Sequence, residues 1–202
     1  MALSQFDPAA PLASLSGASL IPSPLIPETF SPTVTLRISF GAKAVPAGNL
    51  FRASECKLAP TVTIQTERND TSSQLYTLLL VDPDAPTPDD PKFAYWRHWV
   101  VSSIQPTQTT TEYENVVKSG KTLTEYLGPG PKDECKPHRY LFLLYREPQG
   151  FEVQKKDVGG EEFVQRRSFG VNEWVEKHSL ELVGVNWMLG AGDGWKEQHD
   201  EL

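Results

Sequence analysis

Two segments of this chain are apolar on both faces, and they constrain the fold more than any other feature. In residues 75–81, Tyr76, Leu78 and Leu80 alternate with a second apolar set, so neither face suits solvent. The run from Tyr140 to Tyr145 shows the same pattern. Strands of this kind need a covering layer on each side, which predicts central strands of a layered β fold.

Further strands are predicted by alternation of apolar and polar residues. The clearest is 33–40, the segment 61–66 is weaker, and 93–104 and 180–189 are also strand-like. The 17 prolines and 14 glycines supply turns between them. Helical spacing occurs only late, at Val171, Trp174, Val175 and His178. The prediction is a mainly β protein, an antiparallel β-sandwich with a short helix near the C-terminus.

The length of 202 residues suits a single core. Residues 1–32 are rich in Ala, Ser and Pro without a regular period, and we interpret them as an N-terminal arm. Residues 33–190 form the predicted domain, and 191–202 a polar C-terminal tail.

The formal net charge of -7 argues against a nucleic-acid partner and against simple adsorption to an anionic membrane. The N-terminus lacks a basic region, and prolines interrupt its apolar residues, so we expect neither secretion nor a transmembrane segment. Only Cys56 and Cys135 are present, which fits a reducing, cytoplasmic compartment with free thiols, although one bridge is left open.

Three clusters hold residues that could carry chemistry. Asp82 ends a buried strand in a turn stiffened by Pro86, and a carboxylate there is costly unless it is paired. His98 lies on the same predicted strand face as Trp96. A third cluster joins the Gly128–Gly130 loop to His138 and Tyr140; its glycines let backbone N–H groups approach a ligand.

Each cluster alone has a structural explanation. An aspartate can cap a rigid turn, a strand histidine is more often a hydrogen-bonded core residue, and Gly-Pro pairs occur in tight surface loops. Together they are more informative, because the ends of buried strands in one sandwich converge. Two histidines and a carboxylate could also form a metal site or part of a hydrolase triad, but no Gly-x-Ser-x-Gly or His-Glu-x-x-His motif is present. We therefore expect no catalysis, cofactor or metal.

At these residues the sequence resembles the phosphatidylethanolamine-binding proteins, most closely the fungal branch that includes the carboxypeptidase Y inhibitor. The resemblance rests on the block from Asp82 to Pro86, Trp96 and His98, the Gly128-x-Gly130-Pro131 loop, the Pro137-His138-Arg139-Tyr140 run and Asn186-Trp187.

The resemblance implies a large antiparallel sandwich with a small pocket for phosphate-like groups and the phosphatidylethanolamine head group. The residues it assigns to that pocket are Asp82, Pro86, His98, Gly128, Gly130, His138 and Tyr140. Rim candidates are Phe93, where many relatives have tyrosine, Trp96, Lys132, and either Trp187 or Met188 as the lid.

The resemblance also implies a partner, a serine carboxypeptidase that the protein would inhibit. The alternative is a signalling scaffold that regulates kinases or small GTPases, with peripheral membrane contact a further option. In the sequence-based mechanism, His98 and His138 donate to the anion and Asp82 orients an imidazole.

Overall fold

The computed structural model describes residues 7–66, 73–106 and 114–197. The start of the predicted arm, 1–6, and the end of the predicted tail, 198–202, lie outside this range. In chain order the helices and strands are α1 (Leu12–Gly17), β1 (Thr35–Phe40), β2 (Lys43–Ala44), β3 (Leu50–Arg52), β4 (Thr61–Gln65), β5 (Tyr76–Asp82), β6 (Trp96–Ile104), β7 (Lys121–Thr124), β8 (His138–Arg146), α2 (Val171–Lys177) and β9 (Glu181–Ala191). Four short 3₁₀ turns, η1 (Ala53–Cys56), η2 (Val116–Ser119), η3 (Lys155–Val158) and η4 (Phe163–Arg166), lie in the connections.

The strands form two sheets, as the mainly β prediction requires. The small sheet has the order β2-β1-β4, and the large sheet has the order β3-β9-β8-β5-β6-β7. The pairings are antiparallel except that β3 runs parallel to β9. The sandwich prediction is therefore confirmed, with one parallel edge that alternation does not reveal.

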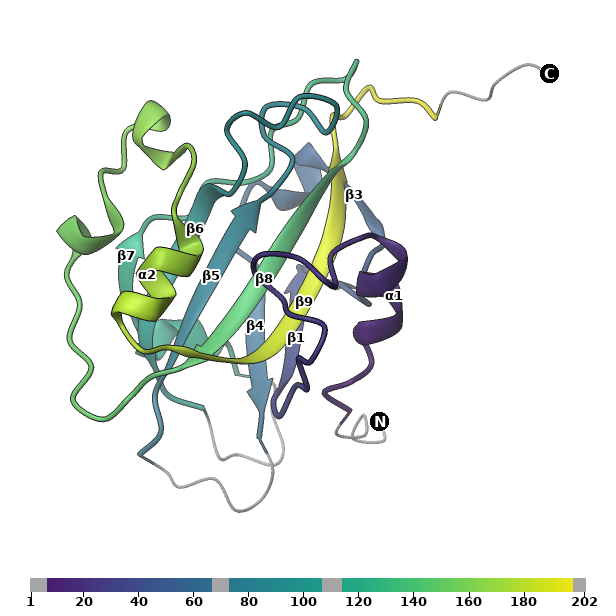
Figure 1. Ribbon diagram of the computed structural model, residues 1–202. Helices are drawn as coiled ribbons and strands as arrows, with labels where there is room; N and C mark the ends of the chain where they lie inside the picture. The colour runs from purple at the N-terminus through teal and green to yellow at the C-terminus, as the bar shows by residue number, and fades with distance from the viewer. Residues whose placement is uncertain (1–6, 67–72, 107–113, 198–202) are drawn as a thin grey trace.

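The two central strands of the large sheet, β5 and β8, are buried on both faces. Leu78 and Leu80 pack toward the small sheet, whereas Leu79 and Val81 pack into a second core on the opposite face. That second core is covered by α2 and the N-terminal arm, which lie on the same side of the large sheet (Figure 1). This explains why these strands have no solvent-facing side.

The N-terminal arm is part of the second core. Leu15, Leu20, Leu25 and Ile26 are each at most 5% exposed. Each burial of this kind stabilises the docked arm by about 2 kcal/mol, before the entropy of ordering the chain is subtracted. Removing the arm would therefore uncover the large sheet.

Strand β6 begins at Trp96, three residues later than predicted. Tyr95 has a φ of 61°, which is left-handed and breaks the extended conformation. No helix within the described ranges is long and apolar enough to cross a membrane. Cys56 and Cys135 are both free thiols.

Candidate anion-binding site

A histidine and an aspartate meet where β5 ends and β8 begins. His138 Nδ1 lies 2.8 Å from Asp82 Oδ2, and both side chains are only 4% exposed. The other oxygen of Asp82 accepts a hydrogen bond from the backbone N–H of Asp84 at 2.7 Å. Because a carboxylate only accepts, His138 donates from Nδ1. Asp82 thus fixes the orientation of this imidazole.

The second ring nitrogen of His138 has no partner. Its Nε2 atom is buried and forms no hydrogen bond within the described chain. An unsatisfied buried polar atom costs about 1–3 kcal/mol. Of the eight such atoms in the described chain, Nε2 of His138 and Nε1 of Trp96 belong to residues of the predicted site, where a ligand or water could complete the structure.

His98 is oriented by a backbone carbonyl. Its Nδ1 lies 2.6 Å from the oxygen of Leu127, and a carbonyl oxygen can only accept, so Nδ1 carries the proton. Burial lowers the pKa of His98, and the opposing field of Asp82 is a smaller effect. His98 is therefore neutral at neutral pH, with Nε2 as a hydrogen-bond acceptor.

Tyr140 contacts both histidines. Its ring is edge-on to His98, with centroids 5.2 Å apart, and stacked on His138, with centroids 6.2 Å apart and planes 14° apart. Burial raises the pKa of Tyr140 well above its ordinary value, so its hydroxyl stays neutral. The aromatic ring fixes the spacing of the two imidazoles.

The loop 127–130 positions the carbonyl that holds His98. A Cβ atom at Gly128 would overlap the carbonyl oxygen of Cys56, so only glycine fits there. The same oxygen accepts a hydrogen bond from Tyr126 Oη at 2.7 Å. Gly130, in contrast, is exposed, and a Cβ there would meet nothing within 4 Å.

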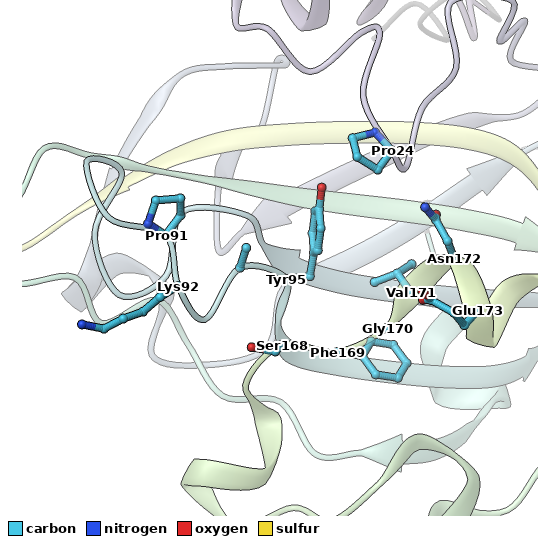
Figure 2. Close-up of a pocket in the computed structure, with 11 residues that line it drawn as sticks. Pro24, Pro91, Lys92, Tyr95, Ser168, Phe169, Gly170, Val171, Asn172 and Glu173 are labelled. Atoms are coloured by element: carbon cyan, nitrogen blue, oxygen red, sulfur yellow. The ribbon is translucent and has the colours of Figure 1, made fainter.

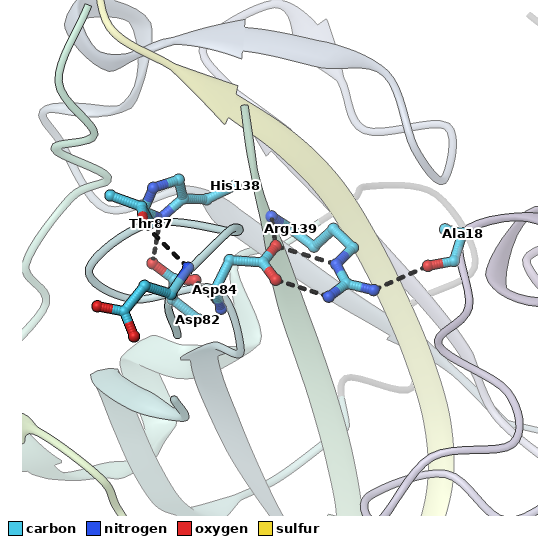
Figure 3. Close-up of polar contacts among 7 residues, drawn as sticks. Ala18, Asp82, Asp84, Thr87, His138 and Arg139 are labelled. Carbon is cyan, nitrogen blue, oxygen red and sulfur yellow. Dashed lines mark hydrogen bonds and ion pairs between the residues drawn. The ribbon is translucent and has the colours of Figure 1, made fainter. Parts of the chain in front are cut away.

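A second acidic residue, Asp84, joins this region to the N-terminal arm. Asp84 is buried and accepts hydrogen bonds from the backbone N–H, Nε and Nη2 of Arg139 at 2.6–2.9 Å. Arg139 also donates from Nη1 to the carbonyl oxygen of Ala18 at 2.9 Å (Figure 3). Hydrogen bonds thus connect His138, through Asp82 and Asp84, to the arm.

The sequence reasoning missed this ion pair. A signal was available, because alternation along β8 places Arg139 on the face opposite His138, beside the turn that contains Asp84.

The comparison with known families decides the classification. The family model described as "Phosphatidylethanolamine-binding protein" matches residues 28–187. The chain belongs to the phosphatidylethanolamine-binding protein family. The resemblance seen in the sequence is therefore confirmed.

Relatives within the family differ in how much of them this chain covers. It is 35% identical over 124 residues to "Protein MOTHER of FT and TFL1 homolog 2" of rice (Oryza sativa subsp. japonica). That alignment spans 61% of this chain and 64% of the rice protein, so this chain covers less than two thirds of the rice protein. It is 29% identical over 186 residues to the carboxypeptidase Y inhibitor of Saccharomyces cerevisiae, spanning 79% of this chain and 84% of the yeast protein.

Solved structures show the same fold. The crystal structure of carboxypeptidase Y inhibitor complexed with its cognate proteinase has a TM-score of 0.76, with 24% identity, and covers 96% of this chain and 100% of the inhibitor chain. A phosphatidylethanolamine-binding protein from Plasmodium vivax has a TM-score of 0.69, also with 24% identity, covering 90% and 97% of the two chains.

Within this family member, the structure brings four predicted site residues into one contact network: Asp82, His98, His138 and Tyr140. Gly128 adjoins the carbonyl that holds His98. Trp96 lies 6.4 Å from His98 between ring centroids. The other predicted residues in the loops, Pro86, Gly130 and Lys132, are exposed.

The two candidates for the lid lie on opposite faces of β9. Met188 pairs with Tyr140 and shares its core cluster. Trp187 packs in the second core, and its Nε1 donates to Ser14 Oγ of the arm at 2.9 Å. Of the two, only Met188 lies on the face of the histidine site.

A cavity of about 400 Å³ lies elsewhere, where the arm residue Pro24 approaches Tyr95 and the start of α2 (Figure 2). None of its lining residues belongs to the predicted site. Among the described residues, no three His, Cys, Asp or Glu side chains are grouped to hold a metal ion.

Proposed function

We propose that this protein binds a phosphate-like anion, including the head group of phosphatidylethanolamine, at the cluster formed by His98, His138 and Tyr140. The observation that carries the proposal is the buried Nε2 of His138, which has no partner although Asp82 orients its ring. Family membership supports the same ligand class.

The hydrogen-bond pattern specifies how binding would work. With both Nδ1 atoms already donating, each neutral imidazole offers only a lone pair at Nε2. His98 stays neutral, so it does not donate to the anion as the sequence-based mechanism expected. His138 can donate to an anion when it takes up a second proton, and the adjacent Asp82 carboxylate compensates the resulting charge. We infer that anion binding is accompanied by proton uptake at His138.

A binding role, without catalysis, fits this chemistry. Burial raises the pKa of the nearby Cys56 thiol to about 12, so it does not form the thiolate that nucleophilic catalysis needs. His98 is held by a carbonyl and His138 by a carboxylate, and no hydroxyl group donates to either ring among the described residues.

The test is an NMR titration with phosphoethanolamine that follows the histidine ring protons. Wild type should show saturable shifts of the His98 and His138 resonances, and His138→Ala should lose them. His178→Ala is the matched control, because His178 lies at the end of α2, outside the site. Equal binding by wild type and His138→Ala would refute the proposal.

A second function, inhibition of a serine carboxypeptidase, is favoured by one observation. The yeast relative, aligned over 84% of its length, is a carboxypeptidase Y inhibitor. The free thiols are compatible with a cytoplasmic location, which stays part of this proposal.

Inhibition should be tested without deleting the arm, because Leu15 and Leu20 belong to the core. Ala13 and Ser16 are exposed on α1, so Ala13→Glu and Ser16→Glu alter only the outward face of the arm. Loss of carboxypeptidase Y inhibition in these variants, but not in His138→Ala, would assign inhibition to the arm. Loss of inhibition in His138→Ala, but not in the arm variants, would assign inhibition to the histidine site. No inhibition by wild type would refute this function.

A further inference from the structure

Arg167 is held by aromatic rings close to the histidine site. Its guanidinium carbon lies 4.2 Å from the ring centroid of Phe93, 5.9 Å from that of Trp96 and 6.0 Å from that of Phe163. Phe163 also packs edge-on against Trp96, with centroids 4.5 Å apart. Stacking on aromatic faces fixes the plane of a guanidinium.

Within the described chain, Arg167 has no hydrogen bond or ion pair. Its Nε is buried without a hydrogen-bond partner. By contrast, Arg97, Arg139 and Arg166 all donate hydrogen bonds. Aromatic rings orient the charge of Arg167 without accepting a hydrogen bond from its buried Nε, which leaves this donor available to an anion.

The location of Arg167 relates it to the proposed anion site. Trp96 contacts Arg167, and the centroid of the same indole lies 6.4 Å from that of His98. Another aromatic partner, Phe93, occupies a predicted rim position. Arg167 and His98 therefore lie near the same indole, that of Trp96.

We propose that Arg167 is a subsite for a second anionic group, a carboxylate, on a ligand whose phosphate lies at His98 and His138. The inference rests on the proposed function and narrows its ligand class to phosphorylated compounds with a carboxylate a few bonds from phosphorus. A planar guanidinium pairs with a carboxylate through two parallel hydrogen bonds. The phosphoserine group has this chemistry, as a lipid head group or as a free compound.

Two ligands that differ by one carboxylate test the subsite. O-phospho-L-serine is phosphoethanolamine with a carboxylate on the carbon that bears the amine. Isothermal titration calorimetry should show that wild type binds phosphoserine about tenfold more tightly, as a charge-assisted hydrogen-bond pair predicts. In Arg167→Gln the two affinities should agree within about twofold, with phosphoethanolamine binding unchanged.

Matched variants separate Arg167 from general electrostatics. Lys92→Gln removes a nearby charge that already has a partner, since Lys92 pairs with Asp90 at 3.2 Å, so the preference should persist. Arg167→Lys keeps the charge without the planar fork and should retain part of the preference. Denaturant unfolding of each variant checks that the fold is intact.

The outcomes distinguish this inference from the proposed function. If wild type binds neither ligand, both fail. If it binds phosphoethanolamine but shows no preference, or if Arg167→Gln keeps the preference, only the carboxylate subsite is overturned. Sedimentation with phosphatidylcholine vesicles that contain phosphatidylserine or phosphatidylethanolamine shows whether the phosphoserine group is bound as a lipid head group or as a free compound. Arg167-dependent selection of phosphatidylserine vesicles supports a lipid, and binding of free phosphoserine alone supports a soluble compound.

Discussion

Replacing Asp82 with asparagine should change which nitrogen of His138 carries the proton. The asparagine oxygen can still accept the N–H of Asp84, which leaves the NH₂ group facing His138 Nδ1. Because two donors cannot pair, Nδ1 must become an acceptor and the proton must move to Nε2. If the asparagine amide were flipped, its NH₂ group would face the backbone N–H of Asp84, which is also a donor, so the flipped orientation is disfavoured.

The effect on binding follows from this change of tautomer. Wild-type His138 needs an extra proton before it can donate to an anion, so binding is coupled to proton uptake and affinity should fall as pH rises. In Asp82→Asn the neutral ring already donates. Its affinity should vary little with pH, and at low pH it should be about tenfold weaker than wild type, because a neutral hydrogen bond replaces a charged one.

Calorimetry with glycerophosphoethanolamine measures this directly, because a phosphodiester does not change its charge over the range of about pH 5.5 to 8.5. Titrations in buffers of different ionisation enthalpy count the protons taken up, about one in wild type and near zero in Asp82→Asn. Asp89→Asn, which removes an exposed carboxylate 70% accessible to solvent, should behave as wild type. Undiminished proton uptake in Asp82→Asn, or a wild-type affinity that is flat with pH, would refute the reasoning.

Three further predictions concern stability and are checked by denaturant unfolding. Arg139→Met should lower the free energy of unfolding by about 3 kcal/mol, because it leaves the buried carboxylate of Asp84 unpaired. Arg146→Met, on the same strand but with a surface partner, should lower it by less than about 1 kcal/mol. Equal losses in the two variants would contradict this prediction. Burial raises the pKa of Glu147, so wild-type stability should decrease as pH rises from about 4.3, the ordinary glutamate pKa, through that raised pKa. Glu147→Gln should remove this decrease. An unchanged pH profile of stability in Glu147→Gln would count against the prediction. Gly128→Ala should lower the free energy of unfolding by about 2 kcal/mol through steric overlap. Gly130→Ala should stay within about 0.5 kcal/mol of wild type. Similar stabilities of the two variants would show that the loop adapts to the added methyl group.

The central strands could be predicted from sequence because burial leaves a direct pattern in the residues. The pattern for β5 and β8 was visible because both faces are apolar. Strands β2 and β3 are two and three residues long, too short to carry a period, and they exist through pairing with β1 and β9. The arm was also unpredictable as core, because its buried leucines are five residues apart, which matches neither the helical nor the strand period.

The proximity of some candidate site residues could be predicted from the sequence, but their hydrogen bonding could not. That Asp82 and His138 lie together follows from the convergence of strand ends. The proton positions do not follow from strand patterns, since the tautomer of His98 depends on the carbonyl of Leu127 in a loop. The surroundings of Arg167 were equally hidden, because two of its aromatic partners, Phe93 and Trp96, lie more than 70 residues earlier in the chain.

The start of β8 has a consequence for how the chain tolerates changes in length. His138 faces the histidine site and Arg139 anchors the arm from the opposite face, so two adjacent residues serve two sides of one sheet. Inserting one residue after His138 would turn every later side chain to the wrong face. Insertions in the exposed segment 132–134 leave the register of β8 unchanged. Insertions and deletions should therefore be tolerated in the loop before β8 but not within the strand from His138 onward.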